Sequence, residues 1–227
     1  MIKLSELCSE QIGPSGFEFV RNGDVNSNLK LKTKAFPWSI VQREFDYLYN
    51  TIVDNNLKRG FEACTGVGIS ALAAGLAMKQ TGGKIVTLDA YIEEYLETPD
   101  YHDQKILNRD SIALQSVHAL IEKYQLENIL VPVVGWTPDH VPVNIETNFT
   151  EPLDYVFIDG GHTPTQLLKD IDVVLPYTNK DTHWLFHDAA DNVFNHSVAA
   201  FVFQKIGKSR VIVCPMSEGC NDLAILR

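Results

Sequence analysis

Two short apolar runs, each ending in acidic and histidine residues, constrain this chain more than any other feature. Both lie in the segment Leu153–Asn192. The first run, Val156–Ile158, is followed by the polar stretch Asp159–His162, and the second, Trp184–Phe186, ends in His187 and Asp188. Runs of this length bounded by polar residues and glycines are typical of buried strands.

The residues between the two runs predict an amphipathic helix. Thr163 is a residue type favoured at the N-cap, Pro164 suits the first helical position, and Gln166 follows three residues after the cap. Apolar residues then recur at helical spacing: Leu167, Leu168, Ile171, Val174 and Leu175. A strand, a helix and a second strand predict two parallel strands whose carboxyl ends share one edge of a sheet. Open α/β sheets bind ligands at that edge, so the acidic residues and histidines are candidate site residues.

The same alternation extends along most of the chain. Short apolar runs at 60–63, 85–88 and 129–134 are separated by helical patterns, and the runs at 210–214 and 223–226 predict a closing antiparallel pair. We therefore predict an α/β fold with a mainly parallel seven-stranded sheet, a C-terminal antiparallel hairpin and helices on both faces.

Composition narrows the classes of function. Hydrophobic residues make up 45% and charged residues 21%, as in ordinary soluble domains. The net charge of −10 argues against nucleic acid and anionic membrane surfaces as partners, because both require clustered Lys and Arg. No apolar run is long enough to span a bilayer. The four cysteines lack metal-type spacing, and we expect reduced thiols in a cytoplasmic protein.

The N-terminal quarter is harder to interpret. Residues 1–55 are expected to form a cap or lid over the ligand end of a main domain at 56–227. Within the cap, apolar spacing predicts an amphipathic helix that begins near Pro37 and runs to Ile52.

A glycine loop follows the first strand of the regular region. The segment Gly66–Ala71 fits the pattern G-x-G-x-x-A, and Asp89 ends the next strand about 20 residues later, as in dinucleotide-binding proteins. Free N–H groups at a helix start and a carboxylate that accepts ribose hydroxyls suit an adenosine cofactor. The alternatives are a tight turn without a ligand and a helix-capping or solvated acid at Asp89.

Glu62 discriminates between adenosine cofactors. It lies at the end of the strand before the glycines, where a pyrophosphate has little use for a carboxylate. The ammonium group in the amino-acid tail of S-adenosylmethionine can instead pair with it. A surface ion pair is the alternative role for Glu62.

Several segments in this order resemble the class I S-adenosylmethionine-dependent methyltransferases. They are Glu62–Ser70, the strand ending at Asp89, Gly135–Thr137 with Pro142 beyond it, Phe157–His162, Phe186–Asp188 and the closing Leu223–Arg227. The branch that the chain resembles most is the small O-methyltransferase-like group with the macrolide-sugar O-methyltransferases and cephalosporin-hydroxylase-like proteins. The resemblance covers about residues 58–227.

The resemblance implies roles by position. The cofactor-binding residues that it implies are Glu62, Cys64, Thr65, Gly66, Gly68, Ser70, Asp89, Ala90, Gly135, Trp136, Thr137 and Asp159. The loop with Glu62 would hold the methionine part, Asp89 the ribose, and Trp136 and Thr137 the adenine. His162 would take the proton of a substrate hydroxyl, a task that suits a reference pKa of about 6.5. Asp159, His187 and Asp188 would hold a divalent metal such as Mg²⁺ beside the methyl group.

Two departures leave parts of this assignment open. Cys64 stands where the family usually has glycine, which predicts some displacement of the loop. His187 stands where metal-binding members carry an acid, so hard oxygen ligands come only from Asp159 and Asp188. A metal-dependent site and a site that has lost its metal are both compatible with this sequence.

The sequence thus predicts a methyltransferase that acts on a small-molecule hydroxyl, of a sugar or another metabolite. A NAD-dependent oxidoreductase is the alternative, but it leaves Glu62, the Asp159–His162 stretch and the terminal hairpin without a role. The third hypothesis is a non-catalytic cofactor-binding protein of the same fold. The oligomeric state stays open, with a homo-oligomer among the alternatives.

Overall fold

The computed structural model describes residues 2–21, 29–32, 39–91, 107–160, 163–187, 211–214 and 223–226. The helices are α1 (Leu4–Leu7), α2 (Gln42–Asp54), α3 (Ile69–Thr81), α5 (Ile112–Tyr124), α6 (Val141–Asn148), α7 (Pro164–Val174) and the 3-10 helix η1 (Leu175–Tyr177). The strands are β1 (Gln11–Ile12), β2 (Phe17–Arg21), β3 (Leu29–Leu31), β4 (Arg59–Ala63), β5 (Lys84–Asp89), β6 (Leu130–Val134), β7 (Leu153–Ile158), β8 (Thr178–Phe186), β9 (Val211–Cys214) and β10 (Leu223–Leu226).

A seven-stranded sheet forms the centre of the molecule, with the strand order β6-β5-β4-β7-β8-β10-β9. The first five of these strands pair in parallel, and β10 is antiparallel to both of its neighbours. This arrangement confirms the predicted mainly parallel sheet with a C-terminal hairpin. The direction of the crossovers changes between β4 and β7, and in open α/β sheets ligands bind beside such a switch point.

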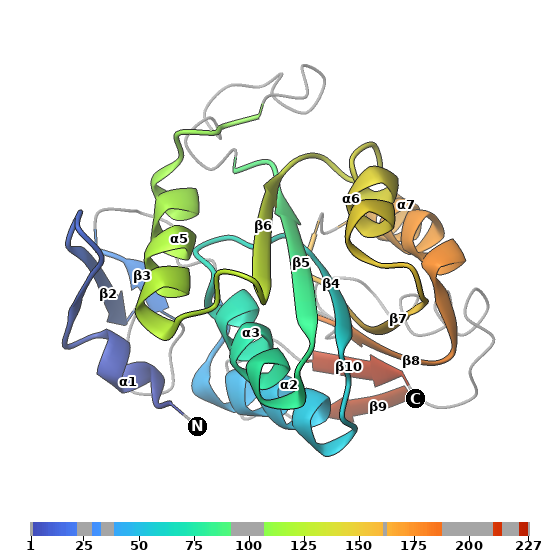
Figure 1. Cartoon of the computed structure of the whole chain (residues 1–227), viewed down its shortest axis with the longest axis horizontal. Coiled ribbons are helices and arrows are strands. Elements are labelled where there is room, and N and C mark those ends of the chain that lie inside the picture. Colours follow the sequence, from blue (N-terminus) through green and yellow to red (C-terminus); the bar gives the residue numbers. More distant parts are fainter. Residues whose placement is uncertain are drawn as a thin grey trace.

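Helices cover both faces of this sheet. Helices α2, α3 and α5 pack with one set of buried apolar side chains, and α6 and α7 pack with a second set on the opposite face. Figure 1 shows α2 beside α3, with α6 and α7 together on the other side of the strands. The middle of β4 is buried on both faces, as expected for the central strand of a doubly covered sheet.

The predicted helix starts are partly confirmed. The Oγ1 atom of Thr163 accepts a hydrogen bond from the backbone N–H of Gln166 at 3.2 Å, so α7 begins where the sequence predicts. The prediction that α2 begins near Pro37 is wrong, because the helix begins at Gln42. Glu44 accepts a hydrogen bond from the backbone N–H of Val41 at 2.8 Å, and this contact caps the helix five residues beyond Pro37.

The N-terminal region contains elements that the sequence did not predict. Strands β1, β2 and β3 form a small antiparallel sheet of their own. Its buried residues, Phe19 and Leu29 among them, join the same apolar cluster as Phe45 of α2 and Tyr155 of β7. The N-terminal segment therefore shares a core with one face of the main sheet. The short helix α6 was not predicted either.

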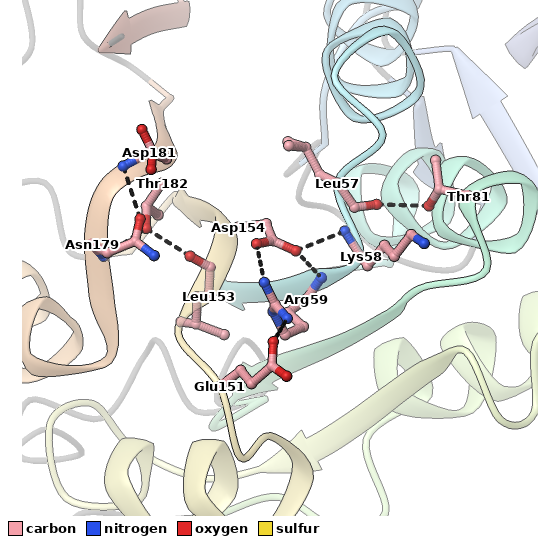
Figure 2. A network of polar contacts seen from close by, with 10 residues as sticks. All are labelled: Leu57, Lys58, Arg59, Thr81, Glu151, Leu153, Asp154, Asn179, Asp181 and Thr182. Atoms are coloured by element: carbon pink, nitrogen blue, oxygen red, sulfur yellow. Dashed lines mark hydrogen bonds and ion pairs between the residues drawn. The ribbon is translucent and has the colours of Figure 1, made fainter.

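The amino ends of the central strands carry a network of polar contacts (Figure 2). The guanidinium of Arg59 at the start of β4 pairs with Glu151 and, at 2.6 Å, with Asp154 of β7. The second carboxylate oxygen of Asp154 accepts the backbone N–H groups of Lys58 and Arg59 at 3.0 and 3.1 Å. Beside it, the hydroxyl of Thr182 in β8 donates to the carbonyl of Leu153 at 2.6 Å. These contacts join three neighbouring strands at the edge opposite the predicted site.

Among the described residues, none of the helices combines the length and the apolar composition needed to cross a membrane. The sequence also predicts a helix that is capped by Asp191 and bears Val198, Phe201, Val202 and Ile206, and this segment lies outside the described residues.

Candidate active site

Loops from four parallel strands meet at the carboxyl edge of the sheet. Backbone hydrogen bonds continue the pairing past the strand ends, from Cys64 to Leu88, from Gly135 to Asp89, from Asp159 to Ala63 and from His187 to Ile158, at 2.8 to 3.1 Å. These bonds hold the four loops beside one another. The sequence prediction that the carboxylates share one edge is therefore supported by the strand register.

The glycine loop turns the chain from β4 into α3. Gly68 has a φ of 89°, and a Cβ atom there would lie 2.8 Å from Cγ2 of Val117. Only glycine fits without movement of α5, because both the backbone conformation and the space exclude a side chain. Cys64, where the family usually has glycine, also adopts a left-handed conformation with a φ of 77°. Its backbone thus takes the conformation that favours glycine, at a cost of about 1–2 kcal/mol for a residue with a Cβ atom.

Glu62 is buried below this loop. Its Oε1 atom accepts a short hydrogen bond from the Ser70 hydroxyl at the start of α3, whereas Oε2 is buried without a hydrogen-bond partner among the described residues. The pKa of Glu62 is raised to about 8, mainly by burial and further by the charges of Asp159 and Asp89, whereas hydrogen bonds from Ser70 and Thr87 oppose the increase. The surface ion pair that was the alternative role for Glu62 is wrong, because only 1% of the residue is exposed.

Asp89 closes the loop from the neighbouring strand. Its two carboxylate oxygens accept the backbone N–H groups of Gly66 at 2.8 Å and Tyr91 at 2.7 Å. Burial raises the pKa of Asp89, and these hydrogen bonds partly oppose the increase. The contacts tie the tip of the glycine loop to the end of β5. Thr65 and Ala90 are buried beside them, and the hydroxyl of Thr65 lies 2.6 Å from that of Thr87.

The loop after β6 carries the predicted adenine-side residues. The backbone N–H of Trp136 donates to Nδ1 of His140 at 3.0 Å, and the side-chain amide of Gln166 in α7 donates to the Thr137 hydroxyl at 3.2 Å. The same amide donates to Asp170 at 2.9 Å. Burial raises the pKa of Asp170 to about 6, against hydrogen bonds from Thr137 and Gln166 that lower it.

Asp170 also connects this loop to the end of β7. A Cβ atom on Gly160 would lie 2.7 Å from Oδ2 of Asp170, so the backbone at Gly160 passes directly over that carboxylate. Sequence reasoning missed this role, because an acid on a helix with an apolar face is normally assigned to the solvent side. The only signal is its spacing of four residues from Gln166.

Asp159 and His187 end β7 and β8 in direct contact. Nδ1 of His187 lies 3.0 Å from Oδ1 of Asp159, and Nε2 lies 3.2 Å from Oε1 of Glu44 in α2. Glu44 is a second acid beside His187, and the sequence did not indicate it because 143 residues separate it from His187. The predicted base His162 and the predicted ligand Asp188 lie outside the described residues, which contain no group of three or more His, Cys, Asp or Glu side chains able to hold a metal ion.

Comparison with known proteins identifies the family. A profile described as methyltransferase domain matches residues 62–189, from the acid at the end of β4 to the loop after β8. The chain belongs to this methyltransferase family. The match covers the glycine loop, Asp89 and the Asp159 segment, so the resemblance to class I methyltransferases is confirmed for the domain that carries the site.

Solved structures show the same methyltransferase fold. The O-methyltransferase of Streptomyces achromogenes involved in tomaymycin synthesis, in complex with SAM, has a TM-score of 0.62 at 14% identity over 84% of this chain and 81% of its own. The O-methyltransferase from Bacillus cereus, in complex with SAH, has 0.61 at 17% identity over 83% and 81%. An SAH-bound methyltransferase of Podospora anserina has 0.55 at 15% identity over 85% and 82%.

Proposed function

We propose that this methyltransferase transfers the methyl group of S-adenosylmethionine to a hydroxyl oxygen of a small molecule. The observation that carries the proposal is the gathering of Glu62, Asp89 and Asp159 at the ends of three adjacent parallel strands. The charges of Asp89 and Asp159 both raise the pKa of the buried Glu62, so the three carboxylates lie in one electrostatic field. A cationic ligand relieves this repulsion.

S-adenosylmethionine has the charges that such a site favours. It carries a sulfonium and an ammonium group, whereas the pyrophosphate of NAD carries two negative charges that the three acids would repel. The NAD-dependent alternative is therefore weaker than it is on the G-x-G-x-x-A pattern alone. The SAM- and SAH-bound neighbours of the same fold favour the same cofactor.

In this proposal, different residues of the loop region contact different parts of the cofactor. Glu62 holds the ammonium group through its buried Oε2 atom, and the Gly66–Ser70 backbone faces the methionine part. Asp89 holds the ribose, while Gly135, Trp136 and Thr137 line the adenine side. Thr65 and Cys64 shape the turn, and Ala90 packs beneath the ribose.

The chemical step needs alignment and one proton acceptor. The substrate oxygen attacks the methyl carbon, the carbon–sulfur bond breaks with its electron pair going to sulfur, and S-adenosylhomocysteine leaves. His162 accepts the hydroxyl proton, and Asp159, three residues earlier, fixes the start of the loop that carries it. Residues 1–55 cap this end of the domain over the substrate.

The divalent metal that the sequence leaves open has no part in this mechanism. Asp159 and His187 contact each other directly, and the second nitrogen of His187 faces Glu44. Metal-ligating histidines commonly donate their other ring N–H to a carboxylate, so Nδ1 of His187 and the carboxylate of Asp159 would hold a divalent metal if one binds here. The cytoplasmic location, the absence of nucleic-acid and membrane partners and the oligomeric state remain predictions.

Calorimetric titration with S-adenosylhomocysteine, with NAD as the control, tests the proposal. We expect saturable binding of S-adenosylhomocysteine at one site and none of NAD. Binding of NAD alone would overturn the assignment in favour of an oxidoreductase. Binding of S-adenosylhomocysteine without methyl transfer to any of a panel of sugar and phenol hydroxyls would favour the non-catalytic reading.

A further inference from the structure

Helix α7 connects two loops of the candidate site that the sheet keeps apart. Thr137 lies in the loop at 135–140 after β6, here called the adenine-side loop, and Gly160 follows β7, with β5 and β4 between these two strands. The side-chain amide of Gln166 donates to the Thr137 hydroxyl at 3.2 Å. A Cβ atom on Gly160 would lie 2.7 Å from Oδ2 of Asp170. One turn of α7 therefore contacts the chain on both sides of the ends of β5 and β4.

Asp170 fixes the direction of the Gln166 amide. Its Oδ1 atom accepts a hydrogen bond at 2.9 Å from Nε2 of Gln166, which lies four residues earlier on the same side of the helix. An ionised carboxylate accepts hydrogen bonds and donates none, so the nitrogen of the amide faces Asp170. The same nitrogen faces the Thr137 hydroxyl, which accepts a hydrogen bond from α7. Without the carboxylate, either end of the amide would pair with the hydroxyl.

The acid at position 170 is costly for the fold. Only 1% of Asp170 is exposed, and its Oδ2 atom has no hydrogen-bond partner among the described residues. A buried carboxylate with an unpaired oxygen destabilises a protein relative to an apolar side chain of similar size. The apolar packing of α7 comes from Leu167, Ile171 and Val174. The hydrogen bond to Gln166 gives Asp170 a role that a packing residue would not fill.

The adenine-side loop also has contacts within itself. A Cβ atom on Gly135 would lie 2.8 Å from Cβ of His140, so the His140 side chain packs directly over that glycine. Nδ1 of His140 accepts the backbone N–H of Trp136 at 3.0 Å. These contacts shape the loop locally, whereas Gln166 ties it to a helix 29 residues further along the chain. Trp136 and Thr137 are both partly exposed, so a ligand can reach them.

We propose that Gln166 and Asp170 are positioning residues that hold the adenine-side loop in the place where it binds adenine. The proposal rests on the proposed methyltransferase function, and neither residue is assigned a contact with the cofactor. Asp170 orients the amide of Gln166, the amide holds Thr137, and the loop presents Trp136 and Thr137 to the adenine. The two residues thus set the affinity for the adenosine part of the cofactor and not for its amino-acid tail.

Titration calorimetry of the full chain with two ligands tests the role in binding. S-adenosylhomocysteine carries adenosine and the amino-acid tail, whereas 5′-methylthioadenosine lacks the tail. We expect Gln166→Met, which keeps the length of the side chain without its amide, to raise the Kd for both ligands about 10-fold. Glu62→Gln should raise the Kd for S-adenosylhomocysteine alone, and Asp172→Asn, at an exposed acid on α7, should change neither. Unchanged Kd values in Gln166→Met, or an increase for one ligand only, would overturn the proposal.

A double-mutant cycle tests whether Gln166 acts through Thr137. Once Thr137→Val has removed the hydroxyl, adding Gln166→Met should raise the Kd less than about 2-fold further. Additive effects of the two substitutions would contradict the proposal. Asp170→Asn should bind S-adenosylhomocysteine more tightly than Asp170→Leu, because only the asparagine keeps an acceptor for the amide. Equal Kd values in these two variants would remove Asp170 from the proposal.

The fluorine resonance of Trp136, in protein labelled with 5-fluorotryptophan, reports on the loop without any ligand. Trp136→Phe assigns this resonance. We expect Gln166→Met to shift it and Asp172→Asn to leave it unchanged, because only the first substitution alters the contact with the loop. An unshifted resonance in Gln166→Met would overturn the positioning role. Wild-type protein that binds neither ligand would overturn the proposed function, and the resonance would still show whether α7 positions the loop, so the two failures are distinguishable.

Discussion

The two ends of the central strands use acidic residues in opposite ways. At the amino end, Asp154 is paired with the Arg59 guanidinium and with two backbone N–H groups (Figure 2). At the carboxyl end, the hydrogen bonds that Glu62 and Asp89 accept from the described residues come from hydroxyl, thiol and backbone groups, and burial raises the pKa of both. The first arrangement neutralises charge within the protein, and the second leaves two acids that, in the proposed function, a cationic ligand neutralises.

Along the same strands, the acids at the amino ends should therefore stabilise the fold, and the acids at the carboxyl ends should bind the ligand. Arg59 and Glu62 lie three residues apart on β4, and Asp154 and Asp159 lie five apart around β7. Loss of a paired acid removes structure, whereas loss of an unpaired buried acid relieves strain in the ligand-free protein and weakens binding. Substitution of an acid at the amino ends should therefore change the free energy of unfolding, whereas substitution of an acid at the carboxyl ends should change the Kd for the ligand.

The largest expected effect is on binding. Asp89→Asn replaces one acceptor with an amide N–H₂ that faces a backbone N–H, and it removes the charge proposed to hold the ribose. We expect the Kd for S-adenosylhomocysteine to rise about 100-fold, which corresponds to about 2.7 kcal/mol. Titration calorimetry measures this change, and an unchanged Kd would remove Asp89 from the cofactor site.

The next effect is on stability at the other edge. Asp154→Asn weakens the contacts with Arg59 and the two N–H groups and is expected to lower the free energy of unfolding by about 2 kcal/mol. The matched control, Glu151→Gln, lies at an exposed side chain and should cost below about 1 kcal/mol. Urea denaturation distinguishes the two, and the Kd for S-adenosylhomocysteine should be unchanged in both variants. A higher Kd in Asp154→Asn would show that the two edges of the sheet do not act independently.

A pH dependence should follow from Glu62. Its pKa is about 8 in the folded protein, against an ordinary value of 4.5, so the folded state favours the protonated form. The stabilisation is complete below pH 4.5 and is lost as the pH rises through 8. Between pH 6.5 and 8.5, above the pKa of about 6 of Asp170, we expect the Tm of the ligand-free protein to fall by several degrees, since about 1 kcal/mol shifts it by about 2–4 °C.

The control for that pH dependence is Glu62→Gln, which should show a much smaller fall in Tm over the same interval. Bound S-adenosylhomocysteine should also reduce the fall, because its ammonium group favours the charged carboxylate. An identical fall in Glu62→Gln would assign the dependence to other groups.

The smallest effect concerns Cys64. Its left-handed backbone costs about 1–2 kcal/mol, and the extra freedom of an unfolded glycine offsets about 0.5–1 kcal/mol of that. Cys64→Gly should therefore raise the free energy of unfolding by about 0.5–1 kcal/mol. Gly68→Ala at the neighbouring left-handed position should lower it, and a loss of stability in Cys64→Gly would show that the thiol packs favourably.

The sequence by itself determined the order of strands and helices in the main domain. Apolar periodicity, the Thr163 cap and the glycines indicate local preferences for helix, strand or turn. The fold keeps these local structures because they are compatible with the tertiary packing around them. The acids that end parallel strands could be placed at one edge for the same reason. The start of α2 could not be predicted in this way. The residue that caps this helix, Glu44, lies inside its first turn, and Pro37 is a stronger local signal for a helix start.

Only the tertiary structure decided which charged groups meet. Glu44 reaches His187 across 143 residues, and Asp170 lies under Gly160 because α7 packs back on the sheet. No local pattern encodes such contacts, because they arise where separately formed elements pack together. The raised pKa of Glu62 has the same origin, since burial between two sheet neighbours and a helix start sets the cost of its charge.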